Sequence, residues 1–298
     1  MNQNYEPSNP LCMPFECFRY NSETHVFPIH SHWHYFAELL LVRNGTALVT
    51  VNDDLQISVN SGCMYFICPQ VTHAITCAEN EHISYDVIKM DINQLDSTPP
   101  YAPDIKSILM DGSQKDLPML FDKAVVQSTG MDRLVTECLR EYRERNYGYD
   151  LVIRAMLYQI TTQIIRQWMK TGFTIRCCVY QSDLFSSVDS ITSYIDKHIR
   201  EGLQVEELAA HCGMSYSGFS KKFKELYGIS CKEYICRVRI AKVEHYLRFT
   251  NEDLTFVSQE TGYSDCSHMI KEFKLVNGIT PGRYRRACRI ESGMEEEA

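Results

Sequence analysis

The feature that most constrains this chain is a helical unit that occurs twice in its last third. The segments VEELAAHCGMSYSGFSKKFKELYGIS, from Val205, and LTFVSQETGYSDCSHMIKEFKLVNGIT, from Leu254, align with a slip of one residue in their second halves. In each copy a short apolar stretch leads to a glycine, Gly213 or Gly262, and a second stretch ends in Gly-Ile. The repeat predicts two copies of one supersecondary unit.

A helix, a short turn with glycine and a second helix together form a helix-turn-helix. Gly213 and Gly262 stand where the chain must leave the first helix, so we expect a positive φ there, which a residue with a Cβ tolerates poorly. We expect Ser215 and Ser264 to cap the second helices through their hydroxyl groups.

The second helix of each unit has one apolar face. Phe219, Phe223 and Leu226 share this face in the first copy, and Met269 and Phe273 do so in the second. Small polar side chains on the opposite face can reach base edges in a major groove, and lysines can contact phosphates. The residues predicted to be exposed there are Ser217, Ser220, Lys221 and Lys224 in the first copy and Ser267, Ile270, Lys271 and Lys274 in the second.

The segment between the two copies, CKEYICRVRIAKVEHYLRFT, has the length of one long helix. A helix of about 20 residues spans about 30 Å, close to the roughly 34 Å between successive major-groove faces of B-DNA. A single such pattern also occurs in helical bundles that bind no DNA, but two copies at this separation favour a DNA-binding domain.

The charge distribution agrees with this interpretation. Residues 186–289 carry 16 Lys and Arg against 13 Asp and Glu, a net charge of +3 within a chain of net charge −8. The last third is therefore the cationic part of an acidic protein, as expected of a part that binds nucleic acid.

The composition is that of a globular protein, with 44% hydrophobic and 23% charged residues. No apolar run approaches the roughly 18 residues of a membrane span, and the first residues do not resemble a secretory signal. The 13 cysteines show no paired spacing typical of zinc or a disulfide framework, so we expect reduced thiols. Together these features predict a cytoplasmic protein without a membrane partner.

The remaining chain predicts two further parts. Residues 1–100 contain short β runs with turns at Asn44-Gly45 and at Asn52-Asp53-Asp54, which suggests a small barrel or sandwich. From Leu117 to about Thr171 the apolar residues recur with helical period, which suggests helices packed on the barrel and offers a possible dimer interface. The expected parts are a strand-rich domain at 1–100, a helical connector at 101–185, a DNA-binding domain at 186–290 and an acidic tail at 291–298.

The stretch HSHWHYFAELLLVRNG, His30 to Gly45, contains histidines in alternation followed by a glutamate. Alternate side chains of a strand point the same way, so His32 and His34 can converge, with His30 beside them if the strand extends that far. Imidazoles and a carboxylate suit Fe, Mn, Ni, Zn or Cu.

The segment from about Val188 to Arg286 resembles the DNA-binding domain of the AraC/XylS family of bacterial transcription regulators. The resemblance rests on LAAHCGMSYSGFSKKFKELYGIS, on YICRVRIAKVEHYL and above all on TGYSDCSHMIKEFKLVNGITPGRYRR. It implies Arg239 on the connecting helix and a final turn fixed by Gly278, Pro281 and Tyr284. The base-facing residues that it implies are Ser217, Ser220, Lys221, Cys266, Ser267, Ile270 and Lys271.

The sequence departs from the family pattern in two respects. Met269 stands where phenylalanine is usual, a core exchange that we expect to be tolerated. Ser217 and Ser220 stand where larger side chains are frequent, so specificity is expected to depend more on the second unit or on DNA shape.

The histidine stretch is similar to the first cupin motif, through His32, His34, Glu38 and Gly45. GCMYFICPQVTH is similar to the second motif and supplies His73, although Val71 replaces the usual glycine. By this resemblance four residues either line an effector pocket or hold a divalent metal, namely His32, His34, Glu38 and His73. No other cofactor is implied. A sugar or small acid suits such a polar pocket.

The resemblances imply an α+β multidomain chain: an N-terminal cupin-like β-barrel with a helical connector, and a C-terminal all-α domain with two helix-turn-helix units. They imply a transcription regulator, usually an activator, that binds promoter or operator DNA as a homodimer and contacts RNA polymerase. The alternative function is a metal-dependent cupin enzyme, a dioxygenase or sugar isomerase, with a helical appendage. The presence of a DNA-binding module favours the regulator, and for a regulator we expect no catalytic residues.

Overall fold

The chain divides into two compact units, with the division between Gln181 and Ser182. The computed structural model describes residues 15–175 and 191–291, except for positions 35, 53, 70, 79, 80, 93, 94, 96–104, 106, 107, 110, 111, 113–116 and 228. The acidic tail, the proline-rich loop after Asp96 and most of the segment joining the units lie outside the described residues.

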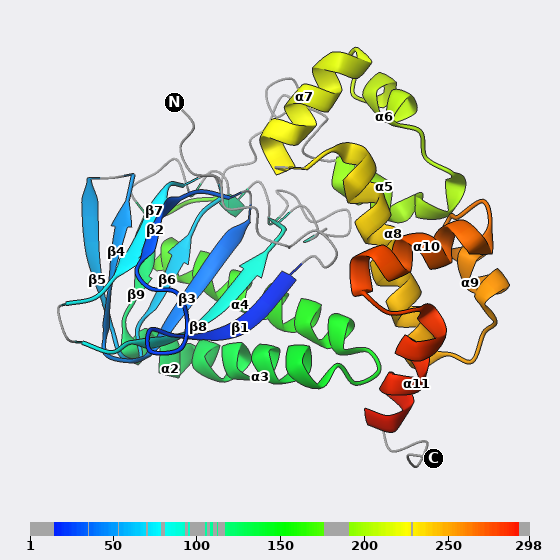
Figure 1. Cartoon of the computed structure of the whole chain (residues 1–298). Helices are drawn as coiled ribbons and strands as arrows, with labels where there is room; N and C mark the ends of the chain where they lie inside the picture. The colour runs from blue at the N-terminus through cyan, green and yellow to red at the C-terminus, as the bar shows by residue number, and fades with distance from the viewer. Residues whose placement is uncertain are drawn as a thin grey trace. The chain divides into compact units, whose positions relative to one another are not determined.

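Two antiparallel sheets form the first unit (Figure 1). The five-stranded sheet has the order β1 (Phe15–Asn21), β8 (Ser84–Met90), β3 (Ala37–Asn44), β6 (Met64–Ile67) and β9 (Leu120–Phe121). The four-stranded sheet has the order β2 (Ile29–His32), β7 (His73–Thr76), β4 (Thr46–Val51) and β5 (Leu55–Asn60).

Residues of both sheets form one apolar core, which includes Leu40, Val49 and Val87. The turns predicted at Asn44-Gly45 and at Asn52 are confirmed, with φ of 74° at Gly45 and 51° at Asn52. The edge strand β5 is mainly exposed, whereas the central strand β3 is buried on both faces from Ala37 to Val42. A strand buried on both faces must have a second layer outside the core.

Helices α3 (Met131–Glu144) and α4 (Tyr149–Lys170) form that second layer, and α2 (Lys123–Thr129) precedes them. In Figure 1 the two longer helices cover the outer face of the five-stranded sheet. On α4 Trp168 is fully buried, and its ring centroid lies 6.1 Å from that of Phe66 on β6. The described helices of the expected connector thus belong to the same compact unit as the sheets.

The helical interpretation of the connector is wrong at Leu120–Phe121, which pair with Tyr65 and Met64 as strand β9. The helical period of the apolar residues begins only after these two residues. An extended segment at this place can form hydrogen bonds with the free edge of β6. The helical period expected along α4 is present, since Met156, Ile160 and Trp168 are buried, whereas Val152 near the start of the helix is 44% exposed.

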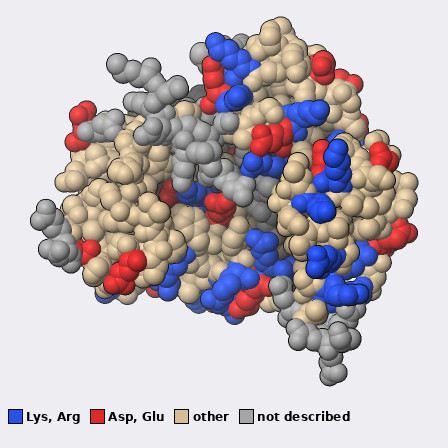
Figure 2. All heavy atoms as spheres, viewed as in Figure 1, with Lys and Arg blue, Asp and Glu red and all other residues tan. Residues whose placement is uncertain are grey.

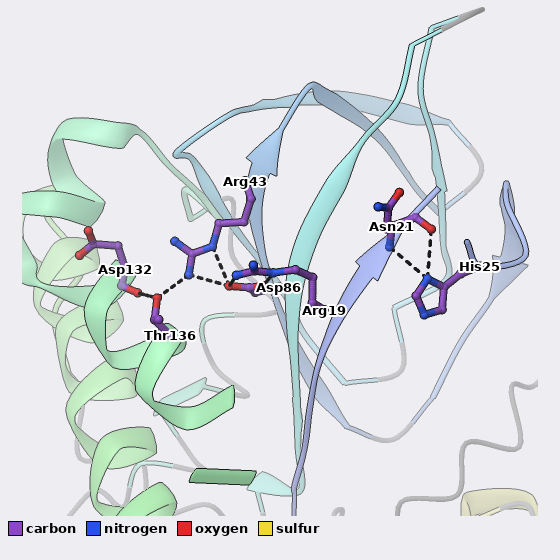
Figure 3. A network of polar contacts seen from close by, with 7 residues as sticks. All are labelled: Arg19, Asn21, His25, Arg43, Asp86, Asp132 and Thr136. Carbon is purple, nitrogen blue, oxygen red and sulfur yellow. Dashed lines mark hydrogen bonds and ion pairs between the residues drawn. The ribbon is translucent and has the colours of Figure 1, made fainter. Parts of the chain in front are cut away.

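A buried carboxylate joins the five-stranded sheet to α3 (Figure 3). Asp86 on β8 is fully buried, and its two oxygens accept hydrogen bonds of 2.6 and 3.1 Å from Arg19 on β1. Arg43, at the end of β3, donates to the same carboxylate at 2.6 Å and to Thr136 Oγ1 of α3 at 2.7 Å. Charge-assisted hydrogen bonds to Asp86 therefore hold three strands together, and Arg43 extends the network to α3.

The second unit is entirely helical over its described residues (Figure 1). It comprises α5 (Ile191–Lys197), the short 3-10 helix η2 (Ile199–Glu201), α6 (Val205–His211), α7 (Tyr216–Tyr227), α8 (Cys231–Phe249), α9 (Leu254–Glu260), α10 (Cys266–Asn277) and α11 (Pro281–Glu291). The pairs α6–α7 and α9–α10 are the two predicted helix-turn-helix units, and α8 is the predicted long helix between them.

The turns of the two units have the predicted backbone but different caps. Gly213 and Gly262 have φ of 64° and 79°, which confirms the predicted positive φ. Ser215 Oγ accepts a hydrogen bond from Gly218 N at 3.3 Å, so the predicted cap of α7 is confirmed. The cap predicted at Ser264 is wrong, because the N-cap of α10 is Asp265, which accepts from His268 N at 2.7 Å. The second turn is one residue longer, which moves its cap one position along the chain.

The predicted fold class is confirmed, with a strand-rich N-terminal domain and a helical C-terminal domain carrying two helix-turn-helix units. Within the part of the chain that the structure describes, no helix has both the length and the apolar character needed to cross a lipid bilayer.

Replacing Asp86 by asparagine should lower the free energy of unfolding by about 2 kcal/mol, because the two arginines lose their shared anion. The expected loss of unfolding free energy is moderate because the Arg19 side chain is 56% exposed and can be hydrated when the carboxylate is removed. Urea unfolding of the full chain measures the change. Asp54→Asn, at an exposed turn position, is the control and should change stability by less than about 0.5 kcal/mol. Equal stabilities of the two variants would contradict the role of Asp86.

Candidate functional site

The second helix of each helix-turn-helix unit presents a polar face. On α7 Ser217, Lys221 and Lys224 are exposed and Ser220 is half-buried. Behind them Phe219 and Phe223 are fully buried, with ring centroids 5.7 Å apart, as predicted. The side chain of Leu226 lies outside the described residues. The apolar face thus fixes the helix while the polar face stays open to a partner.

Helix α10 repeats this arrangement with a more apolar surface. Met269 and Phe273 are fully buried, so methionine at this position fills the core as expected. Ser267 and Lys271 are exposed, whereas Cys266 and Ile270 are half-buried and pack against the core of the second unit. Cys266 and Ile270 therefore present only part of their surface to a partner.

The final turn also agrees with the sequence analysis. Gly278 ends α10 with φ of 72°, Pro281 is the first residue of α11, and the ring of Tyr284 lies 5.4 Å from that of Phe273 in edge-to-face geometry. In Figure 2 Lys and Arg side chains gather over the helical unit, with Asp and Glu interspersed. Exposed lysines on both α7 and α10 are suited to contact phosphates.

The N-terminal site predicted from the histidine stretch is also formed. His32 at the end of β2, His34 two residues further on and His73 on β7 are all buried, and one nitrogen of each lies within 4.8 Å of the others. The ring centroids of His32 and His73 are 4.3 Å apart. His30, whose participation depended on the length of the strand, is exposed and does not join them.

Backbone carbonyl groups orient the three rings. Nδ1 of His32 lies 2.8 Å from the carbonyl oxygen of His30, Nδ1 of His34 lies 3.0 Å from that of Phe36, and Nδ1 of His73 lies 2.9 Å from that of Val71. Each Nδ1 must therefore carry a hydrogen, which leaves Nε2 with the lone pair in a neutral ring. Hydrogen bonds of this kind are the usual way in which proteins prepare histidines to bind a metal.

Glu38 on β3 completes the group. Its Oε2 lies 2.8 Å from Nε2 of His34 and 3.6 Å from Nε2 of His73, which has no hydrogen-bond partner among the described residues. Burial alone raises the pKa of Glu38, but the charge of Lys89 and the close approach of the His34 and His73 imidazoles outweigh it and hold the pKa well below its usual range. The carboxylate is thus an anion inside the domain.

The arrangement at His34 is chemically incomplete. Both of its ring nitrogens face oxygen acceptors, the carbonyl of Phe36 and the carboxylate of Glu38. A neutral imidazole has one N–H and cannot donate to both. Either the ring carries two protons or another cation lies between Nε2 and the carboxylate.

Sequence reasoning missed Lys89, which is 6% exposed and lies directly opposite Glu38 across β3 and β8. Its ammonium group lies 5.9 Å from the ring centroid of Phe18. The signal was available in SYDVIKM, where Tyr85, Val87 and Lys89 alternate on one face of the strand.

Comparison with curated proteins finds relatives over the helical unit. AdaA of Bacillus subtilis (strain 168), described as a bifunctional transcriptional activator and DNA repair enzyme, is 36% identical over 104 residues, which are 35% of this chain and 49% of AdaA. An uncharacterised HTH-type transcriptional regulator of Staphylococcus aureus is 32% identical over 98 residues, 33% of this chain and 13% of that protein. The chain thus spans less than half the length of these relatives.

Among solved structures, ToxT from Vibrio cholerae aligns over 92% of this chain and 97% of its own at 12% identity, with a TM-score of 0.41. The DNA-binding domain of AdpA, solved in complex with a target DNA, aligns over 37% of this chain and 99% of its own at 22% identity, with a TM-score of 0.36.

Two family models match different parts of the chain. Residues 13–160, which contain the histidine cluster, match the AraC-like ligand binding domain. Residues 208–287, which contain most of the two repeated units, match a helix-turn-helix domain. With an AraC-like ligand-binding domain followed by an AraC-type helix-turn-helix domain, the chain belongs to the AraC family of transcriptional regulators.

Proposed function

We propose that this protein is a transcription regulator that binds double-stranded promoter or operator DNA through α7 and α10 and responds to a ligand bound in its strand-rich domain. The observation that carries the proposal is the repeated helix with a buried phenylalanine face and an opposite face of serines and lysines. Serine hydroxyls can contact base edges and lysines can contact phosphates or guanine. Activation rather than repression stays a prediction.

The two reading helices differ in the contacts that they offer. Helix α7 presents Ser217, Ser220, Lys221 and Lys224, which are small or flexible, while α10 adds the partly buried Cys266 and Ile270 beside Ser267 and Lys271. Apolar groups on α10 can contact a thymine methyl group, which phosphate-binding lysines cannot recognise. We therefore expect α10 to contribute more to sequence choice and α7 more to general affinity.

We further propose that His32, His34 and His73, with Glu38, hold a divalent metal of the Fe, Mn, Ni, Zn or Cu type. The fit is supported by the fixed Nδ1 hydrogen bonds, by the buried Nε2 of His73 without a partner and by the two oxygen acceptors that face the ring of His34. A bound metal would supply open coordination positions for oxygen ligands. A sugar or small acid that uses those positions is the effector class that we favour.

Two alternatives remain distinguishable. The histidines can line a pocket for an organic effector without metal, in which case His34 carries the second proton. The rival function, a metal-dependent cupin enzyme, predicts turnover and no effect of the lysines on DNA binding. We favour a regulator without catalytic activity, because both family matches are to a regulator's domains.

We also propose a homodimer formed through the start of α4. The side chains of Tyr147, Leu151 and Val152 are 82%, 66% and 44% exposed. Neighbouring apolar side chains at this exposure favour a protein interface. Contact with RNA polymerase and a cytoplasmic location stay predictions from the family resemblance.

Lys221→Ala and Lys271→Ala should each weaken binding to an operator fragment, by about 1–3 kcal/mol where the lysine contacts a base and by less where it contacts only phosphate. The affinity of the unchanged protein should also fall steeply as salt is added, because counterions are released from the DNA. Fluorescence anisotropy of labelled DNA measures both effects. Lys170→Ala, at an exposed position of α4, is the control. If both α7 and α10 variants bind like this control, the proposed interface is wrong.

Protein purified without chelator should contain one divalent metal per chain, and His34→Ala should lose it. His30→Ala is the matched control, since His30 belongs to the same stretch but is exposed, and it should keep the metal. Elemental analysis of the purified chains measures the content, and added metal should raise the Tm of the unchanged protein and of the control but not that of His34→Ala. If all three proteins lack metal and added metal raises no Tm, the metal proposal is wrong. The histidines would then line a pocket for an organic effector.

Leu151→Asp should shift the protein from dimer to monomer, because a charge in an apolar interface loses its hydration. Light scattering after size-exclusion chromatography measures the mass. Met169→Asp, near the other end of α4 and 48% exposed, is the control and should stay dimeric. A dimer in both variants would place the interface elsewhere.

A further inference from the structure

The helical unit contains a cavity of about 430 Å³ between the two helix-turn-helix units. Its walls come from the segment after η2, from α8 and from the turn between α9 and α10. The lining residues with polar side chains include Arg200, Gln204, Arg239, Gln259, Ser264 and His268. The volume lies within the range of about 300–1,000 Å³ that small-molecule sites usually have.

Arg239 of α8 is the unusual group in this cavity. Its side chain makes no hydrogen bond and no ion pair with any residue that the structure describes, and its Nε is buried without a partner. Its guanidinium carbon lies 5.5 Å from the ring centroid of Tyr263, which holds it by a cation–π contact. Burial lowers the pKa of Arg239, although the group stays charged. The negative charge of Glu272 acts on Arg239 from nearby, but no carboxylate of the described residues forms a hydrogen bond with the guanidinium. A half-buried cation whose N–H groups lack acceptors is costly to maintain.

The carboxylates near the cavity are bound elsewhere. Glu272 accepts a hydrogen bond from Cys236 Sγ at 3.1 Å, and its other oxygen lies 3.1 Å from His268 Nε2. Glu260 pairs with Arg200 at 2.5 Å. The other basic side chains of the cavity are therefore each paired with a carboxylate, while Arg239 is not.

The backbone makes the wall of the cavity rigid. A Cβ at Gly262 would lie 2.0 Å from the carbonyl oxygen of Ile199, so only glycine allows the second turn to approach η2 this closely. Gln204, the N-cap residue of α6, thereby shares one cavity with Ser264 and His268, which flank the start of α10. An occupant of the cavity would contact the N-cap residue of the first helix-turn-helix unit and the turn of the second.

We propose that this cavity binds a phosphate-type oxyanion, with Arg239 as its principal cation. The planar guanidinium offers several N–H groups to such an anion, and the amides of Gln204 and Gln259 and the hydroxyl of Ser264 are further donors. The anion comes either from a free phosphorylated small molecule or from a phosphate of bound DNA. In both cases it would fix the two reading units relative to each other.

The test uses the full chain and Arg239→Gln, with inorganic phosphate and pyrophosphate as probes. Arg237→Gln is the matched control, because Arg237 is also on α8 but pairs with Glu233 at 2.7 Å. One arm measures Tm with each probe at constant ionic strength. The other measures the slope of log affinity against log salt on random-sequence DNA, which should become shallower by about 0.9 for each phosphate that the variant no longer binds. If Arg239→Gln does not fold, Arg239→Met, which removes the charge but keeps a long side chain, replaces it in both arms.

A free oxyanion ligand predicts that pyrophosphate raises the Tm of the unchanged protein and of Arg237→Gln by several degrees, with no rise for Arg239→Gln. A DNA phosphate predicts a shallower salt slope for Arg239→Gln alone. If neither probe raises the Tm of the unchanged protein and the slopes of all variants coincide, the proposal is overturned. The Tm arm does not depend on DNA binding, so its failure is distinct from failure of the proposed function.

Discussion

The hydrogen bonds of Asp86 hold together the two strands that carry the charged residues Glu38 and Lys89 of the N-terminal site. This carboxylate holds β1 and β3 to β8 through Arg19 and Arg43, and it reaches α3 through Arg43 and Thr136 (Figure 3). On the opposite face of the same strands, Glu38 and Lys89 lie side by side. The helices and the ligand site therefore share one set of strands, with a charged group on each face. A movement of α3 against the sheet would act on strands that carry Glu38 and Lys89, which gives a ligand a physical route to the helical layer.

The overall fold could be predicted because its signals are local and repeated. Positive φ at Gly213 and Gly262, the buried Phe223 and Phe273 and the cap at Ser215 all follow from residue type and spacing. The cap at Asp265 could not be obtained from the alignment, because the extra residue lies inside the turn and both Ser264 and Asp265 are good caps. Hydrogen-bond geometry, which sequence spacing does not determine, decides between them.

The residues of the N-terminal site that belong to a local strand pattern were predicted from the sequence. The residue whose position depends on pairing between distant strands was missed. His32, His34, Glu38 and His73 follow from two motifs, and the structure brings them together. Lys89 belongs to neither motif, and its position beside Glu38 depends on the register of β3 against β8. In the same way β9 depends on an edge of β6 that is distant in sequence. Long-range register is set by packing of whole sheets, and a single sequence records it weakly.

Both proposed ligand sites rest on the same physical argument about buried polar groups. Nε2 of His73 and Nε of Arg239 are buried without a hydrogen-bond partner among the described residues. An unsatisfied buried polar atom costs about 1–3 kcal/mol, a large fraction of the stability of an ordinary domain. The two atoms require opposite ligands, since a lone pair beside a carboxylate attracts a cation and a guanidinium attracts an anion. A cation site in the ligand-binding domain and an anion site between the reading units would then be two separate inputs to one DNA-binding surface.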